Sequence, residues 1–283
     1  MKLFDFDRSF YAYCADWLKA HPGKSEDEAE EAFGELRGEW EHLPVRELNG
    51  CSPADYFGTF RDPEALLEQM EEYDRQGMAL PEYLTERVAQ LGAGAVPSLV
   101  KRISDESLSQ TVRCACFTLL TEADPAGCAE LAAQIVKNAA EGDELSDAAA
   151  NYLSEDFGRL TDTLMDAYTR APDHARRLIL DIASSYGPNE SVEEAVLERM
   201  RTHAEDRVFC AALLGRSGTD RALEPLRELL RLPDIGFVEY REICNTIEML
   251  GGDVEEDRDF SGDADFETVQ ADSSEFFGNW KDG

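Results

Sequence analysis

The stretch from Arg207 to Gly252 constrains the fold of this chain more than any other feature of its sequence. Its leucine and isoleucine residues recur at steps of three and four, which places them on one face of each of three successive helices. Gly218 and Gly251 follow the first and third helices, where a residue is often needed in the left-handed conformation. Pro233 cannot continue the second helix. The stretch is therefore predicted to form three helices separated by turns.

Helix pairs with the same pattern follow one another from residue 92 onward. We expect five pairs, over residues 94–104 with 109–122, 125–138 with 143–155, 158–169 with 173–186, 191–203 with 206–216, and 220–231 with 238–250. The second helices align on one position, which we call the arginine ladder: Arg113, Arg176, Arg207 and Arg241, with Ser146 in the second pair. The steps along it are 33, 30, 31 and 34 residues. Such a period is typical of a solenoid, whose units bury their apolar faces only by stacking.

Two segments carry a resemblance to HEAT repeats. They are GAGAVPSLVKRISDE (92–106), which leads to Arg113, and GTDRALEPLRELLRLPD (218–234), which leads to Arg241. A proline in the first helix and a basic residue opening the second match that family. The resemblance implies an all-α fold, a right-handed α-α solenoid of about five HEAT-like helix pairs over residues 91–252. It also implies that each ladder arginine pairs with an acid of the turn within its repeat. The candidate acids are Asp105, Asp173, Asp206 and Asp234.

Residues 1–90 are richer in aromatic side chains and match no part of the repeat. Trp17 and Trp40 lie here, with a dense group of phenylalanine and tyrosine residues near the amino end. Proline and capping signals predict helices over about 7–20, from the capping box of Ser25 and Glu28 to about Trp40, and over 53–57, 63–76 and 81–92. We expect this region to form an aromatic-rich helical cap at the amino end of the repeats.

The charge of the chain restricts its partners. Asp and Glu number 60 against 27 Lys and Arg, so the formal net charge is −33. A surface of this sign repels phosphate backbones, which argues against binding to nucleic acid or to an anionic membrane. It favours a basic partner, although high charge also serves solubility alone. We therefore expect the partner to be a protein or a peptide. The negative charge of the chain is compatible with a basic one.

Cysteine usage and hydropathy indicate a compartment. The chain has seven cysteines, an odd number, at scattered positions that do not suggest a disulfide framework. No amino-terminal leader pattern is evident, and no apolar run approaches the roughly 18 residues of a membrane-spanning helix. We interpret the chain as a cytoplasmic protein kept in the reduced state.

Signatures of catalysis are sparse. The four histidines lie in unrelated contexts, and none has the spacing of paired metal ligands. Some HEAT-like proteins are di-iron hydroxylases built on repeated His-Glu pairs, but this sequence contains no His-Glu dipeptide. Cys114 and Cys116 would point apart on a helix, and Cys116, Cys210 and Cys244 share one ladder position, as small buried residues would. We expect a non-enzymatic protein without a catalytic, cofactor or metal site.

The solvent side of the second helices is the first candidate for a binding surface. Five residues beyond each ladder position stand small, mostly polar side chains: Thr118, Asn151, Asp181, Ala212 and Thr246. If these helices line a concave face, as in the resembled family, the floor of the groove is shallow and can receive a helix or a peptide. The alternative is that small residues only allow a tight superhelix to curve.

Residues 253–283 form an acidic tail that contains aromatic side chains. They include eleven acids and two bases, and the aromatics are Phe260, Phe266, Phe276, Phe277 and Trp280. Aromatic residues within acidic sequence can dock on a basic or apolar patch. The tail is interpreted either as a disordered acidic segment with aromatic anchors or as a segment folded back along the repeats. We favour a partly ordered tail whose Phe and Trp residues contact the chain's own surface.

Part of the tail resembles a calcium-binding EF-hand loop. Asp257, Asp259, Ser261 and Asp265 stand at ligand positions, with Gly262 at the turn. The last ligand position of that family is a bidentate Glu, and here it is Thr268. The departure leaves only a weak expectation of Ca²⁺ binding.

Two functional hypotheses follow from these patterns. The first, which the HEAT resemblance implies, is a scaffold or adaptor that binds a protein or peptide on the face formed by the second helices. The second is an acidic decoy or chaperone-like protein that neutralises a basic partner by imitating nucleic acid. Salt separates them, because decoy binding falls steeply with ionic strength and docking on apolar contacts does not.

Overall fold

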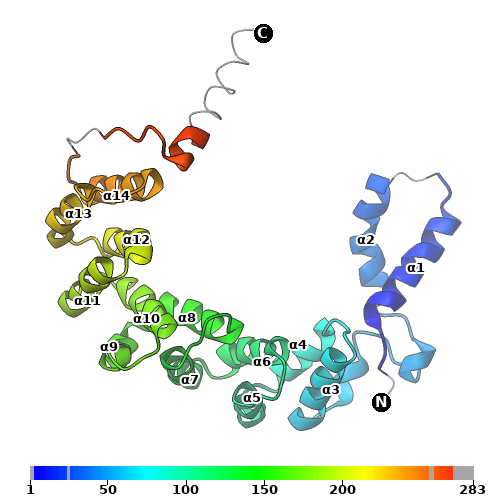
Figure 1. The fold of residues 1–283 in the computed structure, drawn as a ribbon. Helices are drawn as coiled ribbons and strands as arrows, with labels where there is room; N and C mark the ends of the chain where they lie inside the picture. The colour runs from blue at the N-terminus through cyan, green and yellow to red at the C-terminus, as the bar shows by residue number, and fades with distance from the viewer. Residues whose placement is uncertain (1–2, 24–25, 255–257, 270–283) are drawn as a thin grey trace, which may run out of the picture. The chain divides into compact units, whose positions relative to one another are not determined.

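The computed structural model describes residues 3–23, 26–254 and 258–269, and within these ranges every regular element is a helix (Figure 1). The helices are α1 (Phe6–Ala20), α2 (Glu26–Trp40), α3 (Pro63–Arg75), α4 (Glu82–Gln90), α5 (Val96–Ile103), α6 (Gln110–Ala123), α7 (Pro125–Lys137), α8 (Glu144–Asp156), α9 (Thr161–Tyr168), α10 (Asp173–Ser184), α11 (Glu190–Thr202), α12 (Arg207–Ser217), α13 (Leu223–Leu230) and α14 (Phe237–Met249). Short 3₁₀ turns are η1 (Arg46–Leu48), η2 (Tyr56–Thr59), η3 (Gly92–Gly94), η4 (Gly158–Leu160), η5 (Ala204–Asp206) and η6 (Asp220–Ala222). The prediction of an all-α chain is confirmed, with helix bounds close to those expected from the sequence.

Local signals place the helix ends. Asp62 accepts a hydrogen bond from the backbone N–H of Glu64 (3.1 Å) at the start of α3, as a capping aspartate should. Gly218 has a φ of 72° at the end of α12, in the left-handed region that favours glycine. The short helix expected over 53–57 is displaced, because residues 53–55 form a turn and η2 follows it.

The chain divides into two compact units, which are described separately. The first contains residues 1–131 with 143–145, and the second contains residues 132–142 with 146–283. This division differs from the boundary expected near residue 90. Helix α3 packs against α5 and α4 packs against α6, so the end of the expected cap belongs to the same unit as the first predicted pair.

Within the second unit, three of the predicted helix pairs are present. Helices α9 and α10, α11 and α12, and α13 and α14 pack in pairs, and the second helices α10, α12 and α14 pack on one another in succession (Figure 1). Gly215 allows the close approach of α12 and α14, because a Cβ added there would lie 3.2 Å from the Thr246 methyl carbon. Cys210 lies fully buried in this core, at the ladder position predicted for small apolar residues.

Two ladder arginines bind the end of the helix that precedes them. Arg113 Nε donates to the carbonyl oxygen of Ile103 (2.9 Å), the last residue of α5. Arg176 donates to the carbonyl oxygens of Tyr168 (3.2 Å) and Thr169 (2.9 Å) at the end of α9. The last carbonyls of a helix lack intrahelical partners and carry partial negative charge. The arginines therefore satisfy the helix ends of their own pairs.

The other two ladder arginines have different partners. Arg207 Nη1 lies 3.4 Å from Glu239 Oε1 and 3.7 Å from Asp234 Oδ2. The guanidinium carbon of Arg241 lies 5.9 Å from the centre of the Phe237 ring. Asp234 thus lies near Arg207 of the preceding helix pair. The sequence led us to expect Arg241, the ladder arginine of its own pair.

The acids expected to pair with Arg176 and Arg207 instead bind Arg199 of α11, whose side chain is 2% exposed. Two of its nitrogens donate to the two carboxylate oxygens of Asp173 at 2.9 Å, and Nε donates to Asp206 Oδ2 at 2.5 Å. Asp206 is buried in η5 just before α12, and Asp173 begins α10. Arg199 therefore joins three elements of the second unit.

A similar arginine joins helices in the first unit. Arg102 of α5 is buried, and its Nη1 donates to Glu64 Oε2 (2.6 Å) while its Nε donates to Glu71 Oε1 (3.0 Å). Both glutamates belong to α3. The guanidinium lowers the pKa of Glu64 together with a hydrogen bond from Ser98, which is the larger cause. Arg102 thus fixes α5 against α3.

Residues 258–269 contact the last helix pair, as the sequence led us to favour for the tail. Phe260 is buried, with its ring centre 5.0 Å from Tyr240 and 5.5 Å from Phe237. The Phe266 ring lies 5.0 Å from Phe237. Three of the five aromatic residues predicted to anchor the tail lie outside the described residues: Phe276, Phe277 and Trp280.

Polar contacts fix the same segment. Arg258 donates to the carbonyl oxygens of Leu230 (3.3 Å), Leu232 (2.6 Å) and Pro233 (2.9 Å) at the end of α13. Asp263 accepts a hydrogen bond from the backbone N–H of Phe237 (3.1 Å) at the start of α14. The hydrogen bond from Phe237, together with those from the backbone N–H groups of Phe266 and Asp265, lowers the pKa of Asp263. Arg258 thus donates hydrogen bonds to the carbonyl oxygens at the end of α13. Arg113 and Arg176 do the same at the ends of α5 and α9.

Replacing Arg199 tests the buried ion pairs of the second unit. Arg199→Leu leaves the buried carboxylate of Asp206 without its closest cation, and we expect a loss of about 3–5 kcal/mol in the free energy of unfolding. Urea denaturation followed by circular dichroism measures this. The control is Arg201→Leu on the exposed side of the same helix, expected to change stability by less than about 0.5 kcal/mol. Equal stability of the two variants would contradict the assignment.

Replacing Phe260 tests the docking of the tail. Phe260→Ala removes a ring buried against Tyr240 and Phe237, and we expect it to destabilise the chain by about 3 kcal/mol. The matched control is Val269→Ala, whose side chain is exposed at the end of the same segment. Thermal melting measures both, and an unchanged melting temperature for Phe260→Ala would show that the segment does not stabilise α13 and α14.

Candidate binding surfaces

Four of the five predicted groove residues are at least partly exposed. Thr118, Asn151 and Ala212 are exposed, and Asp181 is partly exposed. Thr118 lies on α6 in the first unit, while Asn151, Asp181 and Ala212 lie on α8, α10 and α12 in the second. The residues of the second unit are therefore considered together, and Thr118 by itself.

Thr246 differs from the expectation that it faces solvent. Its side chain is 5% exposed, and its hydroxyl donates to the carbonyl oxygen of Glu242 (2.9 Å) within α14. Its methyl group packs over Gly215 of α12. Because glycine has no side chain, α12 comes close enough to cover the position that was expected to lie in the groove.

Exposed apolar side chains lie on the two helices that flank this contact. Met249 is 73% exposed, and Val208 and Val238 are among the exposed large apolar residues of the described chain. Met249 and Val238 lie on α14, and Val208 and Ala212 lie on α12. We call these four residues the α12–α14 surface. It carries apolar side chains on two helices that pack against each other, with Val238 and Met249 near opposite ends of α14.

An ion pair lies beside the α12–α14 surface. Arg216 of α12 donates to the carboxylate of Asp181 (2.5 Å) and to its backbone carbonyl (2.7 Å) on α10. Asp181, predicted as a groove residue, is therefore neutralised by an arginine that the sequence did not single out. Both side chains remain partly exposed, so the pair contributes little to stability.

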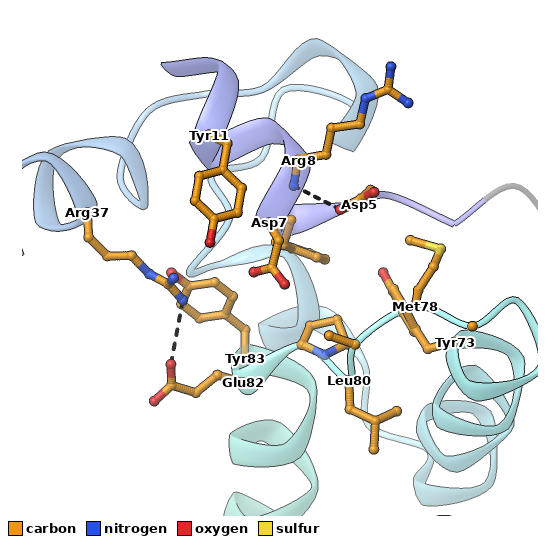
Figure 2. Close-up of a pocket in the computed structure, with 14 residues that line it drawn as sticks. Asp5, Asp7, Arg8, Tyr11, Arg37, Tyr73, Met78, Leu80, Glu82 and Tyr83 are labelled. Atoms are coloured by element: carbon orange, nitrogen blue, oxygen red, sulfur yellow. Dashed lines mark hydrogen bonds and ion pairs between the residues drawn. The ribbon is translucent and has the colours of Figure 1, made fainter. Parts of the chain in front are cut away.

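A cleft that the sequence analysis missed lies in the first unit. It has a volume of about 550 Å³ and is lined by the start of α1, by α2, and by the connection from α3 into α4 (Figure 2). The volume lies within the range of roughly 300–1,000 Å³ that ligand sites occupy. We call it the N-terminal cleft. Its lining includes Asp5, Phe6, Asp7, Arg8, Tyr11, Arg37, Tyr73, Met78, Leu80, Pro81, Glu82 and Tyr83.

Buried tyrosines shape one wall of the N-terminal cleft. The Tyr73 hydroxyl donates to the carbonyl oxygen of Phe4 (2.8 Å), and the Tyr83 hydroxyl donates to Glu41 Oε2 (3.1 Å). Burial raises the pKa of both phenols, so both remain protonated donors at neutral pH. Phe6 packs against Tyr83 at 5.7 Å between ring centres. The wall is therefore held by contacts between residues far apart in the sequence.

Charged groups line the mouth of the N-terminal cleft. Arg37 Nη2 lies 3.6 Å from Glu82 Oε2, and its guanidinium carbon lies 5.4 Å from the centre of the Phe10 ring. Figure 2 shows the Asp7 carboxylate and the Tyr11 hydroxyl directed into the cleft, while the Arg8 side chain is directed away from them. Tyr11 is 68% exposed. The sequence gives no signal for this site, because its walls come from segments about seventy residues apart.

The predicted calcium ligands of the tail are only partly described. Asp257 lies outside the described residues. Asp259 accepts hydrogen bonds from the backbone N–H (2.9 Å) and the hydroxyl (2.6 Å) of Ser261, and Asp265 lies in a helical turn over residues 264–269. Within the described part of the chain, no group of three or more His, Cys, Asp and Glu side chains is placed to hold a metal ion.

The cysteines of the ladder are poor nucleophiles. Cys116 and Cys210 are fully buried, and burial raises the pKa of each thiol to about 12. Cys244 is partly exposed, and burial raises its pKa as well. Because the thiolate is the reactive form, these side chains serve packing rather than chemistry.

None of the helices in the described residues has both the length and the apolar composition needed to cross a membrane. Comparison with protein-family models, with curated proteins and with solved structures found no match to this chain.

Proposed function

We propose that the chain is a HEAT-like helical-repeat protein that binds a protein or peptide without catalysing a reaction. The packed pairs and the stacked second helices of the second unit support the repeat assignment. The ladder arginines support it too, since Arg113 and Arg176 hold equivalent helix ends in different pairs. A right-handed solenoid of about five such pairs is the arrangement that the repeat implies.

The α12–α14 surface is the binding face that we assign to this function. The observation that carries it is the exposure of Met249, Val208 and Val238 on two helices that pack together. Exposed apolar side chains that gather on one surface often mark a protein interface. Full burial of a Met or Val side chain contributes about 1.5–3 kcal/mol, so each such contact strengthens binding by about tenfold or more.

The chemistry of the ligand follows from the same surface. We assign to it a helical or extended segment that presents apolar side chains and carries basic residues at its edges. The apolar side chains cover Met249 and the valines, and the basic residues meet the acidic surroundings of a chain with a formal net charge of −33. Methionine suits such a contact, because its flexible thioether adapts to differently shaped partners. The cytoplasm is the working compartment in this proposal, since all seven cysteines are free thiols.

The second candidate function is an acidic decoy that neutralises a basic partner. The high negative charge favours it, because charge alone can drive such binding. Binding of this kind uses exposed carboxylates over much of the surface rather than one apolar patch. It is therefore weakened by salt and insensitive to loss of a single methionine.

Affinity capture from lysate of the source cells tests the α12–α14 surface. The bait is the full chain, compared with the double variant Val238→Asp/Met249→Asp and with a matched control, Leu43→Asp, at an exposed apolar residue of the first unit. We expect the control to capture the same proteins as the unchanged chain. Loss of two apolar contacts should reduce capture by the double variant at least tenfold.

Salt and folding controls complete this experiment. The double variant should melt within a few degrees of the unchanged chain, because both substituted side chains are exposed. Capture that persists in 0.5 M NaCl supports docking on the α12–α14 surface. Equal capture by all three baits that disappears at about this salt concentration contradicts the proposal and supports the decoy.

A further inference from the structure

The N-terminal cleft has the features of a built site rather than a surface irregularity. Its floor and walls are set by buried contacts, including the hydrogen bond from Tyr73 to the Phe4 carbonyl and the packing of Phe6 on Tyr83. Asp5 fixes the start of α1 by accepting the backbone N–H of Arg8 (2.9 Å). Because the wall residues are fixed by contacts with one another, little ordering of the walls is needed on binding.

The polar groups of the cleft leave one carboxylate unmatched. Glu82 faces Arg37 at 3.6 Å, and Asp5 is engaged as the cap of α1. Arg8 is directed away from the cleft in Figure 2, where the carboxylate of Asp7 is directed inward beside Tyr11. Three carboxylates and two guanidiniums therefore line the cavity, and Asp7, an exposed residue in the first turn of α1, is the acid beside which Figure 2 draws no cation.

The walls of the cleft are apolar and aromatic. Met78 and Leu80 line one side in Figure 2, and the rings of Tyr11 and Tyr83 line the other. Pro81 also lines the cleft. A basic side chain combines an apolar stem with a cationic head, which matches apolar walls that end at a carboxylate. A planar guanidinium can in addition stack on a tyrosine ring and bind a carboxylate with two parallel hydrogen bonds.

We propose that the N-terminal cleft binds the side chain of an arginine presented by a basic peptide segment. The guanidinium pairs with Asp7 and lies against the ring of Tyr11, and Glu82 adds negative potential from the opposite wall. The methylene stem contacts Leu80 and Pro81. The site is separate from the α12–α14 surface and does not depend on that assignment.

The competing occupant is an anion held by the arginines. Arg37 offers a guanidinium at the edge of the cleft, but it already has Glu82 as a partner and lies over the rings of Phe10 and Trp40. An anion that enters the cleft would also approach Asp7 and the net negative charge of the whole chain. The arrangement therefore favours a cation.

A blocked tripeptide, acetyl-glycyl-arginyl-glycine amide, tests the site on the full chain. Titration is followed by amide chemical shifts in two-dimensional NMR, which detects millimolar binding and reports where it occurs. We expect shifts confined to the start of α1, the end of α2 and the start of α4. The same peptide with citrulline, which has the shape of arginine without its charge, should bind at least tenfold more weakly. The lysine peptide should bind more weakly than the arginine peptide.

Variants on the same helix identify the residues responsible. Asp7→Asn and Tyr11→Ala are each expected to weaken binding of the arginine peptide at least fivefold, and Asp7→Glu to restore part of it. The matched control is Asp16→Asn, which makes the same charge change at an exposed position of α1 whose carboxylate pairs with nearby Lys19 (2.8 Å). Thermal melting of each variant shows whether α1 remains folded.

Three outcomes overturn the proposal. They are equal binding of the citrulline and arginine peptides, equal weakening by Asp7→Asn and Asp16→Asn, and shifts at the cleft that are produced by inorganic phosphate and abolished by Arg37→Ala. The last outcome would assign the cleft to an anion. The double variant Val238→Asp/Met249→Asp should bind the arginine peptide as tightly as the unchanged chain does. The proposal for the N-terminal cleft and the proposal for the α12–α14 surface can therefore be refuted independently of each other.

Discussion

The hydrogen bond from an arginine to the carbonyls at the end of a helix recurs in both compact units and joins a helix to the element that follows it. Helices α5, α9 and α13 end with carbonyl oxygens that no residue of the helix itself can satisfy. Arg113 and Arg176 reach them from the next helix, and Arg258 reaches them from the tail. Because one guanidinium donates in several directions at once, it fixes the turn and the following helix together. Residues 258–269 are thus part of the last pair rather than an appendage.

The sequence predicts the helices well because their signals are local. Apolar periodicity, Asp62 with Pro63, and Gly218 all act within a few residues, and the structure places helix ends where they indicate. The partners of the ladder arginines were not predictable in the same way. Asp173 and Asp206 have the right charge and position for Arg176 and Arg207, yet both bind Arg199, because that side chain is buried between them and must be neutralised.

Equal positions in a repeat do not guarantee equal environments. Ala212 and Thr246 occupy the same ladder offset, but the first is exposed and the second is covered by α12. The difference arises at Gly215, where the missing side chain lets two helices approach. The N-terminal cleft could not be predicted from the sequence for a related reason. Its walls require Tyr73 to reach Phe4 and Tyr83 to reach Glu41, contacts that no local pattern encodes.

The charge of the chain and the shape of its surfaces have different effects on recognition. Exposed carboxylates attract any basic molecule and speed its arrival, but salt screens them beyond about 8 Å under physiological conditions. They cannot distinguish arginine from lysine, or one basic segment from another. Asp7 beside Tyr11 can, because stacking and paired hydrogen bonds require a planar cation. In the functions proposed above, selectivity therefore comes from the few places where a carboxylate or a methionine lies beside apolar or aromatic side chains.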